Sequence, residues 1–402
     1  MTTTEDRACC LIFSHAVGSE TTGPYPVTAA VPDAVCLAHF LAGLPDPRDR
    51  CGRRFPLTAI VTAAAASVLT SARSLTAIAE WITDAPRWVL LTLGFAFDPF
   101  SKVVTVPHPT TVMRLLGRLD GDAFDAAVST FPQTRAAGLD AEKARWRAVA
   151  VNGKQLRGSR AAGGKAVWLL AAMDHAGTVL AQRQIDTKSN ETPAFIPLLD
   201  GLALENTVVT ADAAHTQHAN GLWLREQGAH YIAVVKGNHP SLLKQSRKLP
   251  WAVALDHKGR TEGRGRLEAC HLKTAAFRHL DRPGARQTLR VMRRRKDLTS
   301  NKLTTERLYF VTSLPPDAAS GAGIAAWIRG HWKIENRLHH VRDTTFAEDA
   351  STICVGRLPR VIASLRKLTI SVCRQDGRTD VPAATRHHAR HPGRPLATLG
   401  WT

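Results

Sequence analysis

Asn206-Thr-Val-Val-Thr-Ala-Asp212-Ala-Ala-His215 is a short β-branched run that stops on a carboxylate, and a segment with helical spacing follows it. An acid at the C-terminal end of a buried strand indicates a site, because ligands of open α/β sheets bind at that edge. Upstream, the run that starts at Arg147 ends on a polar residue, Asn152, in the same way. Downstream, Glu335 lies in a segment with helical spacing. The sequence therefore predicts that three segments converge on one metal site.

The region from residue 147 to residue 235 alternates between strand-like and helix-like periods. The expected elements are strands at 147–152, 167–173 and 179–185, a helix at 191–204, the Asp212 strand, a helix at 216–226 and a strand at 231–235. Asp174-His-Ala-Gly177 supplies a hairpin turn between the second and third strands. The order β-β-β-α-β-α-β predicts an α/β fold with a ribonuclease H-like mixed sheet flanked by helices.

The third acid comes later than this fold requires, because Glu335 lies 123 residues beyond Asp212. Residues 265–313 are strand-like and basic, and they predict a β-rich insertion over about 240–320 that lies on nucleic acid. A helix is expected from about Ile324 to Val341, before which the insertion ends. Four residues at i, i+4, i+8 and i+11 share its polar face, namely His331, Glu335, His339 and Arg342.

The two ends of the chain differ from this central region. Residues 1–35 lack a sustained period and are expected to be poorly ordered. A helical domain is expected over 36–140, with helices at 57–69, from an N-cap at Ser74 to Ile82, and from Thr110 or Thr111 to Leu119. It either reads DNA with one of these helices or serves as a packing or oligomerisation bundle. The catalytic domain is expected over 147–375, and 376–402 as a loosely ordered basic tail.

The composition is that of a globular protein. The chain has 402 residues, 44% of them hydrophobic, which is enough for two or three domains with buried cores. Its longest nearly uncharged stretch, 55–71, is short for a membrane span, and no charged leader with a cleavage site opens the chain. Seven cysteines form no CxxC pair, which argues against a disulfide framework and a zinc ribbon. We expect a protein of the reducing cytoplasm, with no membrane partner.

Positive charge is concentrated in the later part of the chain. The formal net charge is +19, and residues 147–402 hold 40 basic and 20 acidic residues. This excess predicts a polyanionic partner, double-stranded DNA, although a basic surface produced by a GC-rich genome is the alternative. Phosphate contacts are expected from Lys154, Arg157, Lys236, Arg293, Arg294, Arg295, Lys296, His331, Lys333, His339 and Arg342. His331 and His339 have a second interpretation, in which they orient Glu335.

Carboxylates from two strand ends and one helix suit phosphodiester chemistry with two metal ions. One ion activates the attacking hydroxyl and the other stabilises the leaving oxygen, and both prefer hard oxygen ligands. A rival site lies on the same helix, because His331, Glu335 and His339 could bind zinc. That spacing differs from HExxH, in which the two histidines are themselves at i and i+4.

Several motifs, in order over roughly 35–375, resemble the ISAs-type insertion-sequence transposases of the DDE class, also called H-repeat-associated proteins. The matching segments are 151–159 (VNGKQLRGS), 188–193, 210–217 (TADAAHTQ), 235–238, 264–268, 331–336 (HWKIEN) and 343–351, with 46–48, 56–57 and 72–81 in the helical domain. The resemblance implies a ribonuclease H-like core, a β insertion before the glutamate, and Mg²⁺ or Mn²⁺, with two ions expected. Asp212 and Glu335 match the second and third catalytic acids.

The first catalytic position departs from the family pattern, because Asn152-Gly-Lys stands where the family has Asp-Gly-Lys. Asn152 offers one neutral carbonyl oxygen and no charge. If another residue supplies the first ligand, Asp174 on the neighbouring hairpin is the first candidate. The resemblance implies a bacterial, nucleoid-associated enzyme, a homodimer on DNA, that binds terminal inverted repeats and catalyses metal-dependent strand cleavage and strand transfer. Two alternatives stay open: a catalytically inactive DNA-binding derivative, and a metal-dependent nuclease of host defence.

Overall fold

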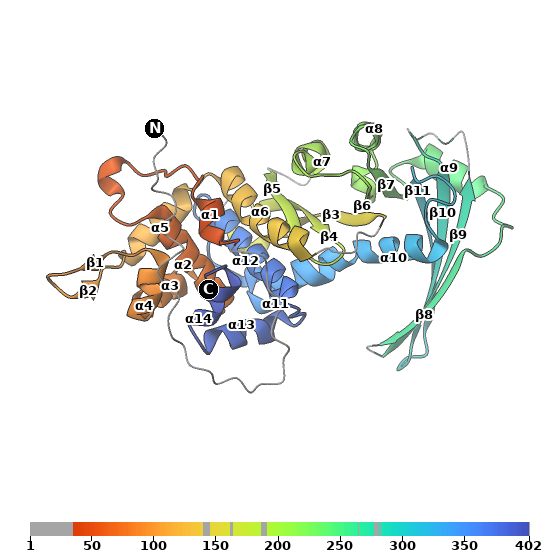
Figure 1. Cartoon of the computed structure of the whole chain (residues 1–402). Coiled ribbons are helices and arrows are strands. Elements are labelled where there is room, and N and C mark those ends of the chain that lie inside the picture. The colour runs from red at the N-terminus through yellow and green to blue at the C-terminus, as the bar shows by residue number, and fades with distance from the viewer. Residues whose placement is uncertain are drawn as a thin grey trace. The chain divides into compact units, whose positions relative to one another are not determined.

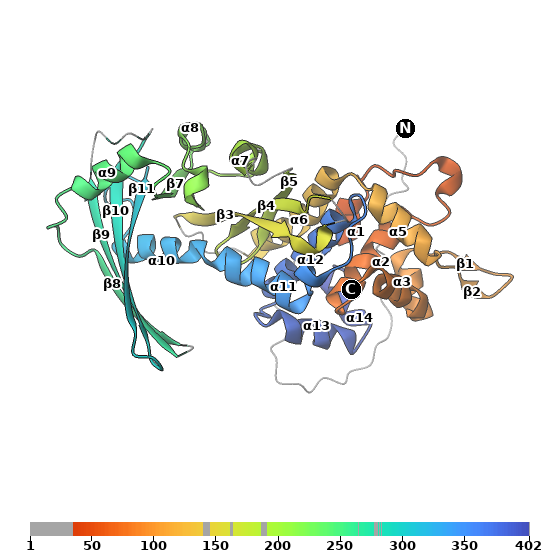
Figure 2. The same cartoon turned by 180° about the vertical axis from the view of Figure 1, so that it is seen from behind.

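The central feature of the protein is one large mixed sheet (Figures 1 and 2). The computed structural model describes residues 35–139, 145–160, 164–185, 191–263, 265–276, 280, 282 and 284–401. The sheet has the strand order β5-β4-β3-β6-β7-β11-β10-β9-β8. Its first half comprises β3 (Arg147–Leu156), β4 (Val167–Asp174), β5 (Val179–Ile185), β6 (Thr207–Ala211) and β7 (His230–Val235). The sequence predicts that residues 1–35 are poorly ordered, and residues 1–34 of that range lie outside the described residues.

These five strands confirm the ribonuclease H-like order. β3 is antiparallel to β4 and parallel to β6, and β6 is parallel to β7. Alternation along β3 sends Val149 and Val151 to one side, where they pack with α7 (Glu191–Leu199) and α8 (His218–Glu226). Ala150 points to the other side, into a core shared with α12 (Leu358–Gln375). Both sides of this half of the sheet are therefore covered by helices.

The segment between β7 and the third acid extends this same sheet. It contains α9 (Pro240–Lys248) and four antiparallel strands, β8 (His257–Gly263), β9 (Arg266–Ala276), β10 (Gln287–Asp297) and β11 (Leu303–Thr312). We call these four strands the arm. β11 pairs antiparallel with β7, so that Tyr309 lies opposite Val235. The insertion is β-rich as predicted, and it is continuous with the catalytic sheet, which its sequence did not indicate.

The N-terminal helices follow the sequence pattern closely. They are α1 (Leu37–Leu41), α2 (Leu57–Leu69), α3 (Leu75–Asp84), α4 (Arg87–Leu93), α5 (Pro109–Arg118) and α6 (Gly121–Leu139), with a hairpin of β1 (Phe97–Asp98) and β2 (Val103–Val104). The Ser74 hydroxyl accepts a hydrogen bond from Ala77 N at 3.0 Å, as expected of an N-cap. The expected cap of α5 at Thr110 or Thr111 is wrong, because the His108 ring accepts from Thr110 N.

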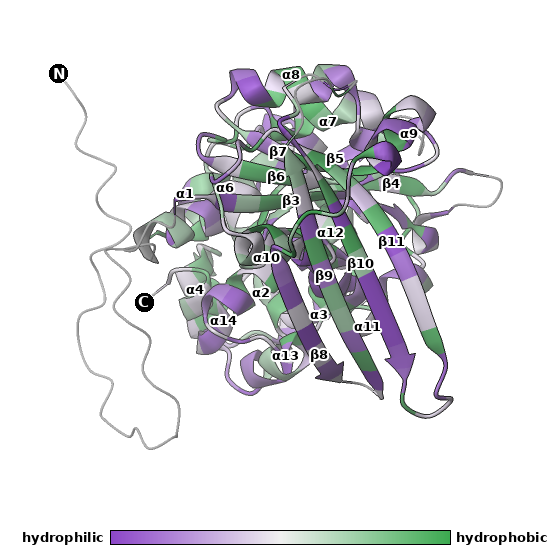
Figure 3. Ribbon diagram, turned by 90° about the vertical axis from the view of Figure 1, so that its right-hand side faces the viewer, coloured by the Kyte–Doolittle hydropathy of each residue, from purple (hydrophilic) through white to green (hydrophobic). Residues whose placement is uncertain are grey.

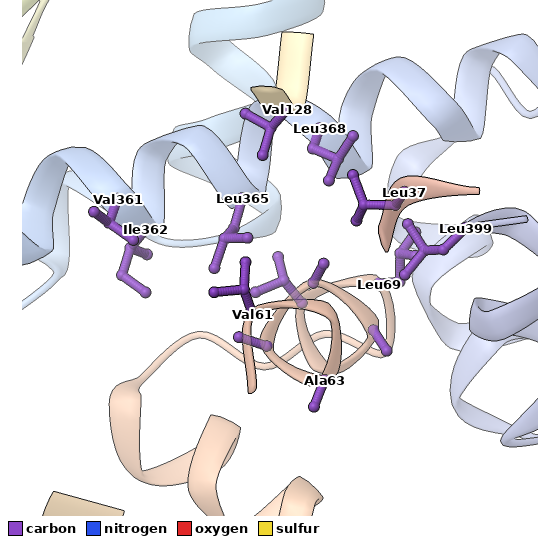
Figure 4. Packing of buried hydrophobic residues seen from close by; sticks show 14 of the residues in the cluster. Leu37, Val61, Ala63, Leu69, Val128, Val361, Ile362, Leu365, Leu368 and Leu399 are labelled. Carbon is purple, nitrogen blue, oxygen red and sulfur yellow. The ribbon is translucent and has the colours of Figure 1, made fainter. Parts of the chain in front are cut away.

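The C-terminal segment completes the core of the N-terminal helices. α12, α13 (Val381–Ala389) and α14 (Gly393–Thr398) bury apolar side chains against α1, α2 and α6. In Figure 4, Leu365, Leu368 and Leu399 lie beside Leu37 and Val61. The expectation of a loosely ordered tail after residue 376 is wrong, because apolar residues at helical spacing, such as Val381 and Ala384, are buried there.

Candidate active site

Two of the predicted site residues lie side by side where β6 ends. Asp212 directly follows β6, but the expected strand end at Asn152 is wrong, because β3 continues to Leu156 along β4. Val151 of β3 pairs with Ala211 of β6, and the next residue of each strand is Asn152 and Asp212. Because the two strands are parallel and in register at this point, Asn152 and Asp212 are neighbours on the same side of the sheet. The register therefore agrees with the prediction that the two residues are neighbours, and Asp212 alone follows a strand end.

Glu335, the third predicted site residue, lies on an interrupted helix and not on the continuous helix expected over 324–341. α10 (Gly321–His331) is followed by a π-helical turn, Glu335–His339, and then by α11 (His340–Thr345). Glu335 is the first residue of that turn, and π-turns are frequent at functional sites. The Asn152 side-chain amide donates a hydrogen bond to Glu335 Oε1. Asn152, Asp212 and Glu335 thus belong to one edge of the sheet.

Asp212 is an ionised carboxylate in a polar setting. Its side chain is 48% exposed and forms an ion pair with Lys236, with 3.0 Å between Oδ1 and Nζ. Partial burial alone would raise the pKa of Asp212, but the hydrogen bond from Ala213 N and the Lys236 ammonium lower it below its usual value. Lys236, expected to contact phosphate, is therefore already paired with a site carboxylate.

Two histidines support the carboxylates. His339 Nδ1 lies 3.3 Å from Glu335 Oε2, and this hydrogen bond is the main reason why the pKa of Glu335 is below its usual value. His331 Nδ1 lies 3.3 Å from the Thr210 hydroxyl on β6. Burial lowers the pKa of His331, while the charges of Asp212 and Glu335 act to raise it. The interpretation in which these histidines orient the site agrees with their contacts better than phosphate binding does.

Lys154 ties the end of β3 to the helix that carries Glu335. Its Nζ lies 2.7 Å from Asp343 Oδ2 and 3.4 Å from Asp349 Oδ1, and its side chain is only 9% exposed. A buried lysine with two carboxylate partners has little surface to offer a phosphate, so we no longer expect a DNA contact there. Gly158 also belongs to this junction, since a Cβ on it would lie 2.4 Å from the Ser351 carbonyl oxygen.

The other predicted phosphate contacts have different environments. Arg157 is 76% exposed, with Asp349 at 3.8 Å, and remains available. Lys333 donates to the His175 carbonyl oxygen at 3.3 Å. Arg342 is fully buried, with its Nε 2.7 Å from Glu348 Oε2, so it cannot reach DNA. The basic cluster at 293–296 is divided by strand alternation between the two sides of the arm.

Two alternative metal ligand sets are not supported. Asp174, on the hairpin beside β3, accepts hydrogen bonds from Gly177 N and Thr178 N at 2.6 and 2.8 Å and therefore caps the turn. It pairs with Val149, three residues before Asn152, so it is no substitute for the first acid. Among the described residues no three His, Cys, Asp or Glu side chains form a metal-binding group, which counts against zinc at His331, Glu335 and His339.

Sequence reasoning missed a buried pair behind the strand end. Glu191, at the start of α7, has its Oε2 3.7 Å from His215 Nε2, and both side chains are nearly inaccessible. A Cβ on Gly153 would lie 2.5 Å from Glu191 Oε1, so the glycine of Asn-Gly-Lys makes room for this carboxylate. Consecutive residues of a strand face opposite sides of the sheet, so Gly153 and Asn152 do. Glu191, which is next to Gly153, therefore lies on the other side of the sheet from Glu335, which contacts Asn152. A carboxylate at the start of the 191–204 pattern was the available signal.

With this geometry in view, comparison with known families is informative. The family profile described as the transposase DDE domain matches residues 123–354, which is more than half of the chain. The chain belongs to the DDE transposase family. A second profile, described as associated with that domain, matches residues 38–131, the region of α1 to α6. The resemblance drawn from the motifs is thereby confirmed.

Relatives of this DDE transposase are found in bacteria. It is 25% identical over 358 residues to "Putative transposase YncI" of Escherichia coli O157:H7, with 84% of this chain and 87% of the relative covered. It is 28% identical over 291 residues to an uncharacterized protein in the dhlA 3′ region of Xanthobacter autotrophicus, with 69% and 94% covered. "H repeat-associated putative transposase YhhI" of Escherichia coli K12 is 26% identical over 246 residues, with 57% and 64% covered.

Likeness to solved structures is weaker. A piggyBac transposase synaptic complex with hairpin DNA aligns with 90% of this chain and 75% of that chain, at a TM-score of 0.40 and 7% identity. Those values are too low to support an argument.

Among the described residues, no helix is long and apolar enough to cross a membrane.

DDE transposases use divalent metal ions, and the donor atoms of this chain fit one. Asp212 and Glu335 are hard oxygen ligands with about half of each side chain exposed. Asn152 can add only its Oδ1 atom, which here accepts from Gly153 N at 2.9 Å. The site therefore has three oxygen-bearing residues but two negative charges.

Proposed function

We propose that this transposase binds the terminal inverted repeats of an insertion sequence and catalyses strand cleavage and strand transfer there. The observation that supports the proposal is the meeting of Asn152, Asp212 and Glu335 at one edge of the sheet. Mg²⁺ or Mn²⁺, two ions bound by these residues, would activate the attacking hydroxyl and stabilise the leaving oxygen. Double-stranded DNA is the proposed partner, engaged by a homodimer.

The protein's own residues have distinct tasks in this proposal. Asp212 and Glu335 supply the negative charge of the ligand set, and His339 orients Glu335 through the hydrogen bond to Oε2. Lys236 neutralises Asp212 while no cation is bound, because its ammonium lies 3.0 Å from the carboxylate. Lys154 fixes the distance between β3 and α11 through Asp343. Asn152 is the weak member, because it brings no charge.

The replacement of Asn152 by Asp tests the proposal. Asn152→Asp restores the third charge and should raise Mg²⁺- or Mn²⁺-dependent nicking of DNA that bears the element's ends by about 10²-fold or more, the size of a single electrostatic contribution in a preorganised site. Asp212→Ala in that background should abolish nicking. DNA binding should be similar in all three proteins.

The same experiment separates this function from the inactive DNA-binding derivative, which the comparisons do not favour. If Asn152→Asp binds DNA but nicks none with either metal, the derivative is the better description. If the natural Asn152 protein already nicks as fast as the Asp variant, Asn152 is no lesion and the assignment of the first ligand is wrong.

A further inference from the structure

The arm has two faces of different charge, and the strand register assigns each residue to one of them. Residues that pair directly across strands point to the same side of a sheet. Arg294 of β10 pairs with Ala269 of β9, which pairs with Arg260 of β8. The same reasoning places seven lysine and arginine residues on one face, the outer face. Two of them, Lys273 and Arg290, lie at its root, and beyond them are five more: Lys258, Arg260, Arg294, Lys296 and Arg307. We call these five residues the outer cluster.

The opposite, inner face is electrically balanced. Arg293 lies 3.4 Å from Glu268 and 3.7 Å from Glu306, and Arg295 lies 3.0 Å from Glu268. Arg266 lies 4.0 Å from Asp297. Three arginines thus face three carboxylates. Closer to β7 the inner face is apolar and packs on α10, through Leu272, Val291 and Ile328.

The outer face has no such balance. At its root, Lys273 donates to the carbonyl oxygens of Trp251 and Val253 at 3.1 and 2.7 Å, and the Arg290 guanidinium lies 4.8 Å from the centre of the Trp251 ring. Beyond that point, no ion pair within the described part of the chain involves the outer cluster. Glu262 is the one acid that the register places on this face. Figure 3 shows hydrophilic residues over most of β8 and the far half of β10.

The outer face lies on the side of the sheet away from the site carboxylates, Asp212 and Glu335. Val208 of β6, Ile232 of β7, Phe310 of β11 and Leu289 of β10 form one apolar cluster with α10 on the inner side. Val208, Thr210 and Asp212 are spaced two residues apart, so their side chains point to the same side of the sheet. The Thr210 hydroxyl contacts His331, the last residue of α10. The site therefore belongs to the inner side. Sheet backbone separates it from the outer cluster.

We infer that the outer cluster is a second DNA surface, which binds the phosphates of a duplex segment other than the one whose phosphodiester lies at Asp212 and Glu335. Like charges that gather on one sheet face destabilise it unless an anion neutralises them, and duplex DNA carries a dense array of phosphates that can do so. Contacts of this kind carry no sequence information. The inference rests on the proposed function, since it assumes that DNA is the partner.

Two double variants that remove equal charge from opposite faces test this inference. Arg260→Gln/Arg294→Gln takes two cations from the outer face, and Arg266→Gln/Arg295→Gln takes two from the exposed part of the inner face. Binding of duplex DNA is measured over a series of salt concentrations. The outer variant should reduce the slope of log K against log salt by about 2, at roughly 0.9 per lost phosphate contact. The inner variant should keep the wild-type slope, because its arginines already have carboxylate partners.

Cleavage gives the second measurement, made with each double variant in the Asn152→Asp protein. At saturating DNA the outer variant should nick as fast as its parent, because its residues lie across the sheet from the carboxylates. Equal slopes for the two double variants would overturn the inference, and so would slower nicking at saturation in the outer variant. A parent that never nicks, together with the expected difference in slope, would instead remove the proposed function and leave the second surface in place.

Discussion

Two sets of carboxylates in this protein look alike in sequence and differ in their surroundings. Asp212 and Glu335 are about half exposed, and each has one close basic partner. Asp125 and Glu348 are 3% exposed, and each has two cations. The first set lies at the edge of the catalytic sheet, where solvent reaches it. The second set lies inside the protein, where it joins α12 to α6 and to the segment after α11.

The comparison shows that an acidic motif can serve structure as well as chemistry. In Asp343-Thr-Thr-Phe-Ala-Glu-Asp-Ala-Ser351, Asp343 and Asp349 bind Lys154, and Glu348 binds Arg342 and Arg366. None of these three acids is a member of the candidate metal site. Exposure and the number of cation partners separate the two roles, and neither can be read from one sequence.

The largest effect on stability is expected from Glu348→Gln. The variant would leave the buried Arg342 and Arg366 without their shared counter-charge, at a cost of about 3–5 kcal/mol in the free energy of unfolding. Asp349→Asn, in the same turn but 31% exposed, is the matched control and should cost less than about 1 kcal/mol. Urea unfolding measures both. Equal losses would erase the distinction between the two sets.

The difference in unfolding free energy between wild type and Glu348→Gln should depend on pH with a definite sign. Burial would raise the pKa of Glu348, but Arg342 and Arg366 hold it below its usual value. A carboxylate with a lowered pKa in the folded state contributes its stability above the ordinary Glu pKa, and the contribution is lost as pH falls toward the lowered pKa. The gap between wild type and Glu348→Gln should therefore narrow in acid. A gap that widens in acid would contradict the ion-pair explanation.

A smaller effect is expected where two glycines approach other groups. The Cβ of Gly158→Ala would meet the carbonyl oxygens of Ser351 and Glu348, which are backbone atoms, whereas that of Gly153→Ala would meet only the Glu191 side chain. Overpacking costs about 1–3 kcal/mol, and Gly158→Ala should lie at the upper end. Adding Glu191→Ser should recover part of the Gly153→Ala loss in thermal unfolding. No recovery would mean that Glu191 is not the obstacle.

The smallest effect is expected from Lys236→Gln at the candidate active site. The Lys236–Asp212 pair is short, but both side chains are about half exposed, so its loss should change the free energy of unfolding by less than about 1 kcal/mol. Chemical denaturation of this variant beside Glu348→Gln gives the direct contrast. A loss near that of Glu348→Gln would place Asp212 among the structural carboxylates.

Much of the fold could be predicted because local signals agree with the tertiary structure. The Ser74 cap, the 57–69 helix and the Asp174–Gly177 turn depend on neighbours in sequence, and all three are present. The expected helix at 191–204 ends at Leu199, and the expected helix at 324–341 is broken by a π-turn. These departures depend on packing against distant strands, which a hydrophobic period does not describe.

The candidate site was predictable only in part. A strand end and a family motif identified Asp212 and Glu335, because those signals are local. The burial of Arg342 and the engagement of Lys154 were not predictable, since their partners depend on how the turn after α11 folds back on β3. Strand alternation in Arg293–Lys296 is visible in sequence, but which pair faces Glu268 depends on the register with β9.

The shared core of the first and last helices has a genetic consequence. Leu37 N donates to the Leu399 carbonyl oxygen at 2.9 Å, and Leu37, Leu396 and Leu399 are buried together with α2. A premature stop codon between codons 376 and 380 would remove α13 and α14 and uncover that core, although every residue of the candidate active site would still be translated. Nonsense mutations in this interval should therefore inactivate the protein as completely as the loss of Asp212.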